Sequence, residues 1–277
     1  MIRDITLGQY YPAKSIIHQL DPRVKLVTTM VYIVSLFVAK GILGYVLATF
    51  FLAMTVKLSK VPFRYITKGL KAIMMILLIT VVFNLFLVDG DIVLWRFGFL
   101  RITDKGVKTA VFMAIRLIYL IIGSSIMTLT TTPNDLTDGL EKLLGPLKKI
   151  HVPVHEIAMM MSIALRFIPI LLEETDKIMK AQIARGADFE TGNLIQKARA
   201  MVPLLVPLFI SAFRRANDLA MAMEARCYHG GDGRTKMKPL HYVSRDRMAY
   251  GLVWGYLLAM IGITWAERLY VTAFWPL

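Results

Sequence analysis

The chain has 277 residues, of which 56% are hydrophobic, yet its formal net charge is +14. A soluble core cannot bury that much apolar surface in a chain of this length, so the composition excludes an ordinary soluble domain and predicts a membrane protein with an additional polar region. The single cysteine, Cys227, excludes an internal disulfide and supports no zinc cluster.

Apolar runs long enough to cross a membrane recur along the chain as two close pairs and one C-terminal run. They are residues 24–39, 42–58, 72–88, 107–129 and 248–265. The predicted fold is therefore an all-α membrane protein with about five transmembrane helices.

Basic residues in short loops mark the cytoplasmic side of a membrane. The loop at 89–106 balances its basic residues with three aspartates. The loop between the second and third runs has no acid and holds Lys57, Lys60, Arg64, Lys68 and Lys71. This distribution places the N-terminus in the cytoplasm and, by alternation along five spans, the C-terminus outside.

Three regions follow from this topology: a four-span membrane region at 1–129, a cytoplasmic coupling domain at 130–247 and a C-terminal transmembrane helix at 248–277. The middle region predicts one short and two long amphipathic helices. Thr132 is a good N-cap for the short helix, which Gly145 and Pro146 end.

The first long helix is predicted from Val154 to Arg185 and the second from about Leu194 to Cys227, because apolar residues recur there at helical spacing. The second helix is strongly apolar between 201 and 213, which predicts a surface that must be covered by a partner. The residues assigned to this surface are Met201, Leu204, Leu205, Leu208 and Phe209.

Both long helices end on alanine, arginine and a small residue. These motifs are Ala184-Arg185-Gly186 and Ala225-Arg226-Cys227. A cation followed by glycine at a helix end also fits an ordinary cap. The repeat favours binding, because an arginine fork makes oriented contacts with carboxylates that lysine cannot reproduce. Antiparallel helices would place the two arginines tens of Å apart, which suits a partner with two equivalent sockets.

The stretch from "TTPNDLTDGLEKLLGPL" through "KAQIARGADF" to "FRRANDLAMAMEARCY", together with the N-terminal "SIIHQLDPRVKL", resembles the transmembrane T subunit of energy-coupling factor vitamin importers, the EcfT/CbiQ-like family. The resemblance implies a prokaryotic plasma-membrane subunit that joins a heterodimer of ATP-binding cassette ATPases to a substrate-binding membrane subunit. The family's paired Ala-Arg-Gly motifs fall on the two motifs above, and their arginines dock into the ATPases. Cys227 departs from that pattern, which leaves the second cap's geometry open.

The same resemblance implies that the chain is shared among several substrate-binding subunits. It implies no cofactor bound directly, with ATP and magnesium used by the partner ATPases, and no nucleic-acid partner. The sequence has no Walker-type loop and no nucleophile with a base, so we expect no catalysis by the chain itself. Alternatives are a T subunit dedicated to cobalt, nickel or biotin, a secondary carrier, and a purely structural anchor.

Two weaker candidates remain. Arg116 lies within the fourth apolar run, where a charge is costly and often functional; pairing with a neighbour such as Asn84 is the favoured interpretation. His151 and His155 are four residues apart without an evident third ligand, so we expect no metal site there.

Overall fold

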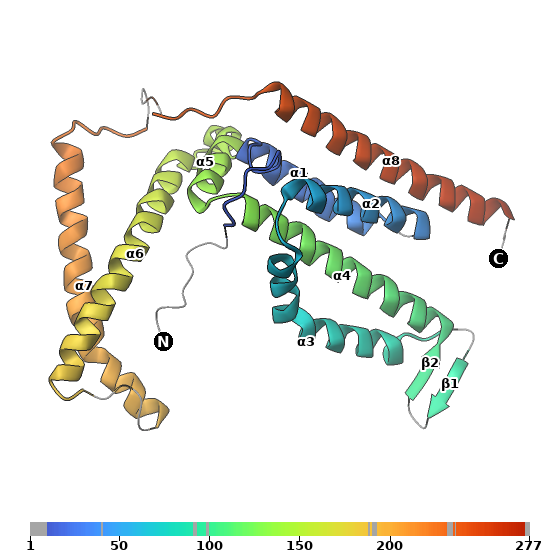
Figure 1. The fold of residues 1–277 in the computed structure, drawn as a ribbon, viewed down its shortest axis with the longest axis horizontal. Coiled ribbons are helices and arrows are strands. Elements are labelled where there is room, and N and C mark those ends of the chain that lie inside the picture. The colour runs from blue at the N-terminus through green and yellow to red at the C-terminus, as the bar shows by residue number, and fades with distance from the viewer. Residues whose placement is uncertain are drawn as a thin grey trace. The chain divides into compact units, whose positions relative to one another are not determined.

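The structure is a computed structural model that describes residues 10–39, 41–90, 93–97, 100–187, 189, 193–231, 235 and 237–274. Most of these residues lie in helices (Figure 1), which confirms the predicted all-α membrane fold. The chain divides into two compact units. One is Leu140–Pro239, and the other combines the described residues before and after it.

The second of these units contains a helix at each of the five predicted apolar runs. They are α1 (Pro22–Val38), α2 (Ile42–Ser59), α3 (Phe63–Leu87), α4 (Asp104–Thr130) and α8 (Ser244–Phe274). Local chemistry fixes where two of them begin. The Asp21 carboxylate accepts the N–H of Arg23 at 2.9 Å before α1, and the Thr103 hydroxyl accepts the N–H of Gly106 at 3.0 Å before α4.

The core of this unit lies among α1, α2, α4 and α8 and includes Ile66 from α3. Leu36 and Met260 have no exposed surface, and the rings of Phe51 and Tyr256 stack at 4.3 Å between centroids. A hydrogen bond of 2.8 Å between Ser35 Oγ and the Tyr256 hydroxyl ties α1 to α8. The N- and C-terminal parts of the membrane region therefore fold around one core.

Length and composition alone select a slightly different set of candidate spans. Helices α2, α4, α8 and α6 (Val154–Ala184) are long and apolar enough to cross a membrane, and α3 would be a fifth although it bends by 60° after Lys71. Helix α1 has only 17 residues. The total agrees with about five spans. An amphipathic helix with an apolar window satisfies the same criteria as a membrane span, so α6 meets them, whereas α1 falls short in length.

The segment between α3 and α4 is predicted as a charge-balanced loop, but it contains a hairpin. Strands β1 (Val93–Phe97) and β2 (Leu100–Thr103) pair antiparallel, with Arg96 opposite Arg101. Runs this short give little periodicity, which is why the sequence does not predict them.

The other unit holds the two long helices, α6 and α7 (Leu194–Glu224), and a 3₁₀ turn at Gly145–Ile150. The short helix α5 (Pro133–Leu143) crosses the boundary between the units. Its predicted cap forms: the Thr132 hydroxyl accepts the N–H of Asp135 at 3.2 Å and donates to that residue's carboxylate at 2.7 Å. Asn193 and Gln196 form a capping box at the start of α7.

Candidate functional site

The candidate site is carried by α6 and α7, which pack against each other with opposite chain directions (Figure 1). Arg215 of α7 donates to the Glu174 carboxylate of α6 at 3.0 Å. Further along α6, Gln182 Nε2 donates to the carbonyl oxygen of Pro203 at 3.3 Å. Later residues of α6 thus meet earlier residues of α7, which establishes the antiparallel pairing predicted for the two long helices.

The contact at Pro203 has a backbone cause. A helical carbonyl normally accepts the N–H four residues later, but that residue is Pro207, which has no N–H. The Pro203 carbonyl is therefore left without its helical partner, and the Gln182 side chain supplies a donor. The sequence contains this signal, because a proline inside a helix leaves the carbonyl four residues before it without an N–H partner.

The first motif ends α6 with a Schellman cap. Gly186 has a φ of +89°, its N–H donates to the Ile183 carbonyl at 2.9 Å, and the N–H of Ala187 donates to the Gln182 carbonyl at 3.0 Å. Arg185 directly precedes the left-handed glycine. A side chain at Gly186 would meet no atom within 4 Å, so only the backbone conformation requires glycine there.

The second motif ends α7 with the same hydrogen-bond pattern. Cys227 has a φ of +54°, its N–H donates to the Glu224 carbonyl at 2.8 Å, and the N–H of Tyr228 donates to the Met223 carbonyl at 3.1 Å. Arg226 directly precedes the left-handed residue, as Arg185 does. The cap geometry that the sequence left open is thus equivalent at the two motifs, even though a cysteine takes the glycine's place.

Both arginines present their guanidinium groups outward. Arg185 and Arg226 are exposed, as are Ala184 and Ala225, and neither arginine forms an ion pair with another residue that the structure describes. Each helix has 31 residues, so an unbent helix of this length would be about 46 Å long. Antiparallel packing therefore puts the two cations at opposite ends of the pair, tens of Å apart.

The apolar residues assigned to a partner surface on α7 are exposed to different extents, and one of them is buried. Met201, Leu205 and Phe209 are 52%, 42% and 61% exposed, and Leu208 is partly exposed. Leu204 is only 5% exposed, so it packs within the chain and is not available to a partner. The periodicity marked the whole apolar run and could not show which of its residues turn inward.

Arg116 is held by other residues than the one predicted. Its Nε donates to the Tyr45 hydroxyl at 3.1 Å and its Nη2 to the Ala39 carbonyl at 3.3 Å. Asn84 instead donates to the Thr80 carbonyl of its own helix at 2.8 Å. The prediction of a structural pairing fits, but Asn84 as the partner is wrong, because the guanidinium donates to α2 and to the end of α1 instead.

The two histidines singled out in the sequence differ in their surroundings. His155 Nδ1 lies 3.0 Å from the Glu141 carboxylate, while His151 has a left-handed backbone with a φ of 63°. Within the described part of the chain, no three histidine, cysteine or acidic residues come together in a way that could hold a metal ion.

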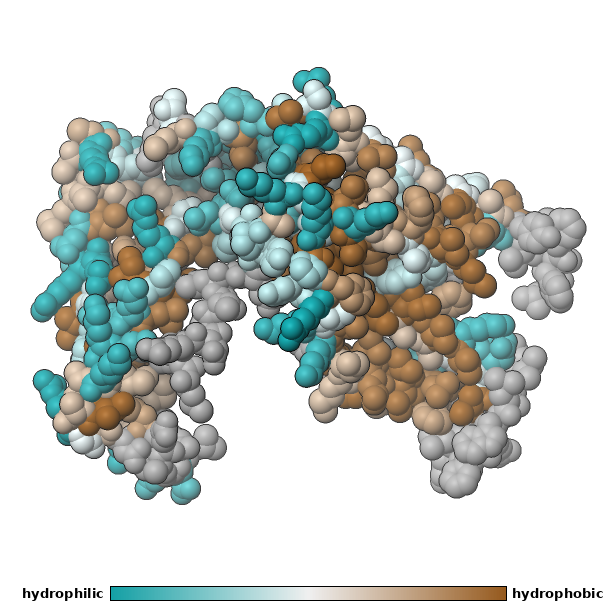
Figure 2. Space-filling model, in the orientation of Figure 1, coloured by the Kyte–Doolittle hydropathy of each residue, from teal (hydrophilic) through white to brown (hydrophobic). Residues whose placement is uncertain are grey.

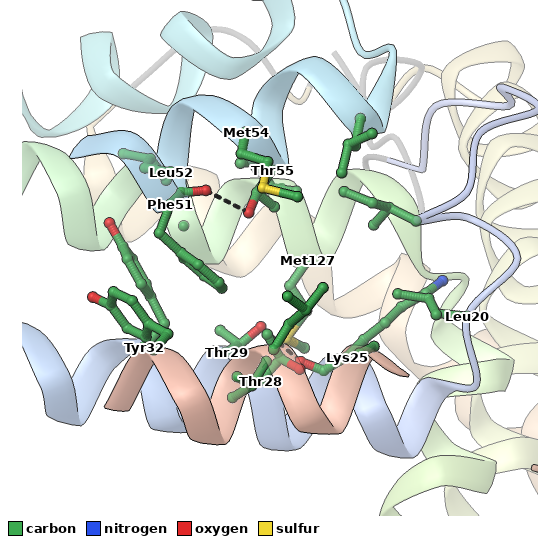
Figure 3. A pocket seen from close by; sticks show the side chains of 18 of the residues that line it. Leu20, Lys25, Thr28, Thr29, Tyr32, Phe51, Leu52, Met54, Thr55 and Met127 are labelled. Atoms are coloured by element: carbon green, nitrogen blue, oxygen red, sulfur yellow. Dashed lines mark hydrogen bonds between the residues drawn. The ribbon is translucent and has the colours of Figure 1, made fainter. Parts of the chain in front are cut away.

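A cavity of about 480 Å³ opens among α1, α2, α4 and α8. Figure 3 shows Lys25, Thr28 and Thr29 on one side of it and Phe51 and Met54 on the other. Its lining is otherwise mostly apolar. The Lys25 ammonium donates to the carbonyls of His18 and Thr130 at 3.1 and 2.8 Å. That lysine therefore joins α1 to the end of α4.

Comparison with known proteins shows the family of the chain. A family model described as cobalt transport protein, CbiQ, matches residues 13–237. The chain belongs to the CbiQ and EcfT family. It is 60% identical over 250 residues to the energy-coupling factor transporter transmembrane protein EcfT of Clostridium kluyveri, covering 90% of this chain and 93% of the relative.

EcfT proteins from other bacteria are also similar to the chain. The identity is 54% over 252 residues with the protein of Ruminiclostridium cellulolyticum, covering 91% of this chain and 94% of the relative. With the protein of Bacillus subtilis it is 47% over 246 residues, covering 89% and 93%. The resemblance drawn from the motifs is confirmed: this EcfT-family chain is a multi-pass membrane subunit of an energy-coupling factor transporter.

Proposed function

We propose that this subunit links two ATP-binding cassette ATPases to a substrate-binding membrane subunit, with Arg185 and Arg226 docked into the ATPases. The observation that carries the proposal is the repeated cap, in which each arginine precedes a left-handed residue at the end of a long helix. Both arginines are exposed and they lie at opposite ends of an antiparallel pair. Two equivalent contacts on one helix pair match the two related subunits of an ATPase heterodimer.

In this proposal the ATPases hold ATP and magnesium, and the chain itself binds no cofactor and catalyses no reaction. The N-terminus and the 130–247 domain are cytoplasmic, where ATP is available, and the C-terminus is outside. Arginine suits the docking role because its planar fork makes two parallel bonds to a carboxylate. The Schellman cap fixes the backbone just beyond each arginine, so little freedom is lost when the contact forms.

Movement of the ATPases would be transmitted along α6 and α7 to the substrate-binding subunit. The exposed apolar surface at Met201, Leu205 and Phe209 lies on the same helix that ends at Arg226. Contacts between α6 and α7 at Glu174–Arg215 and at Gln182 hold the pair together. A displacement at either arginine would therefore move the apolar surface with it.

Copurification of both partner types from one detergent extract tests the proposal. Arg185→Ala with Arg226→Ala should release the ATPases, since loss of a desolvated charged contact costs about 2–5 kcal/mol, whereas a cap-only role would cost about 0.3–1 kcal/mol and spare assembly. Leu205→Glu should release the substrate-binding subunit but retain the ATPases. Ile195→Glu, at an exposed apolar residue of the same helix outside this surface, is the matched control and should retain both partner types. Full retention of the ATPases by the double arginine variant contradicts the docking role.

The breadth of substrates is a separate question. We favour a subunit shared by several substrate-binding partners for vitamins and other micronutrients, in line with the family resemblance. The description of the matching family model as a cobalt transport protein favours a second candidate, a subunit dedicated to one substrate. Deletion of the gene should abolish uptake of several micronutrients in the first case and of one in the second.

A further inference from the structure

Positive charge is concentrated in the segment between the end of α2 and the bend of α3. Five basic residues lie between 57 and 71 with no acidic residue among them. All five are exposed, and none forms an ion pair with another described residue. They are Lys57, Lys60, Arg64, Lys68 and Lys71.

Three of these cations share one helix face. Arg64, Lys68 and Lys71 follow one another at spacings of four and three residues, which places them within about 60° around the helix axis. Ile66 lies on the opposite side and has no exposed surface, so the core anchors the helix from behind. We call Arg64, Lys68 and Lys71 the basic face. The number of basic residues in the sequence predicted only that this loop is cytoplasmic. The helix shows in addition that three of the charges lie together and are exposed.

Aromatic side chains flank the basic face. Phe63 and Tyr65, one residue before and after Arg64, are 64% and 48% exposed. Each is therefore turned about 100° away from Arg64, in opposite directions. Exposed aromatic rings beside cations are typical of the boundary between lipid tails and headgroups. The ring can contact the apolar tails there while the neighbouring cation contacts the polar headgroups.

The bend in α3 separates its basic first part from its apolar second part. Helix α3 turns by 60° between Phe63–Lys71 and Ile73–Leu87. After the bend, most residues are apolar and many are exposed, including Met75 at 75%. Figure 2 shows hydrophilic side chains over the first part of α3 and hydrophobic ones over the rest of the helix. The basic face thus begins where the membrane-embedded surface of the same helix ends.

We propose that the basic face binds the anionic headgroups of membrane phospholipids and anchors the first part of α3 at the membrane surface. Phosphate groups match the charge, and these cations form no ion pair with a described residue that lipid binding would break. Phe63 and Tyr65 insert at the level of the ester groups beside them. The proposal needs only membrane insertion and does not rest on docking of the ATPases.

Lipid-selective quenching tests the proposal on the full chain in vesicles. A fluorophore on Thr67→Cys, in a Cys227→Ser background, reports lipid next to the basic face. Brominated phosphatidylglycerol should quench it more than brominated phosphatidylcholine at the same mole fraction. Changing Arg64, Lys68 and Lys71 together to glutamine should lower the affinity for phosphatidylglycerol relative to phosphatidylcholine at least about fivefold. One basic residue near an anionic surface changes the affinity by a factor of about five.

Two controls separate charge from folding and from location. Arg64→Lys keeps the charge and should keep the preference. Glutamine at Lys142, Lys177 and Lys180, which are exposed in the other unit, removes the same net charge and should leave the preference unchanged. Equal quenching by both lipids in the parent chain overturns the proposal. The proposal is also overturned if the triple glutamine variant keeps the preference for phosphatidylglycerol. Loss of a protein partner by that variant, with the lipid preference kept, would count against the proposal in the same way.

Discussion

The left-handed residue at the second motif offers a quantitative test of the two caps. Cys227 has a φ of +54°, a conformation that costs a residue with a Cβ about 1–2 kcal/mol. Cys227→Gly removes that cost but adds about 0.5–1 kcal/mol of backbone entropy to the frayed state. The difference predicts a net stabilisation of the last turn of α7 by roughly 0.5–1 kcal/mol, which is a factor of about two to five in local opening.

Hydrogen–deuterium exchange of peptides that cover residues 221–229 measures this opening directly. Cys227→Gly should slow exchange by that factor, while Cys227→Ala, which keeps the Cβ and removes the thiol, should exchange like the parent. Gly186→Ala should do the reverse at the end of α6: its Cβ would meet no atom within 4 Å, so the backbone cost acts alone and exchange should speed up by a similar factor. Unchanged or faster exchange in Cys227→Gly refutes the equivalence of the two caps.

Three further predictions concern the membrane region. Arg116→Met should lower stability in detergent by about 1–3 kcal/mol, because Tyr45 and Ala39 lose a charged donor, whereas Asn84→Ala should change the melting temperature little. Partial burial lowers the pKa of His18 from its ordinary value of 6.5, so stability should be complete above about pH 6.5 and fall as the pH drops below it; thermal melts should show this loss in the parent and not in His18→Gln. Single cysteines at Lys60 and Asp89, both exposed, should label from opposite faces of the membrane, and labelling from one face would contradict the orientation.

Helix positions were predictable where local chemistry sets them. The start of α6 at Val154 and its end at Ala184 follow from the apolar periodicity and from the Arg-Gly stop, both of which act over a few residues. The N-cap at Thr132 also depends only on its neighbours. The paired arginines could be found for the same reason, because a repeated helix ending is visible in the sequence.

Features that depend on distant contacts could not be predicted. Arg116 meets Tyr45 and Ala39, which lie 71 and 77 residues away in the sequence, so only the packing of α1, α2 and α4 identifies them. Leu204 and Leu205 are equally apolar neighbours, yet one is 5% and the other 42% exposed. Cysteine has no preference for left-handed backbone, and at Cys227 the hydrogen bonds of the cap impose it.

Site-specific photo-crosslinking from the two arginine positions tests the central claim most directly. Two variants of the assembled transporter carry a photoreactive residue, one at Arg185 and one at Arg226. Each variant should give one crosslinked product with an ATP-binding cassette ATPase. The same residue at Glu173, which is exposed in the middle of α6, serves as the control and should give no ATPase product. Crosslinks from 185 and 226 to the substrate-binding subunit, or to lipid alone, would contradict the account.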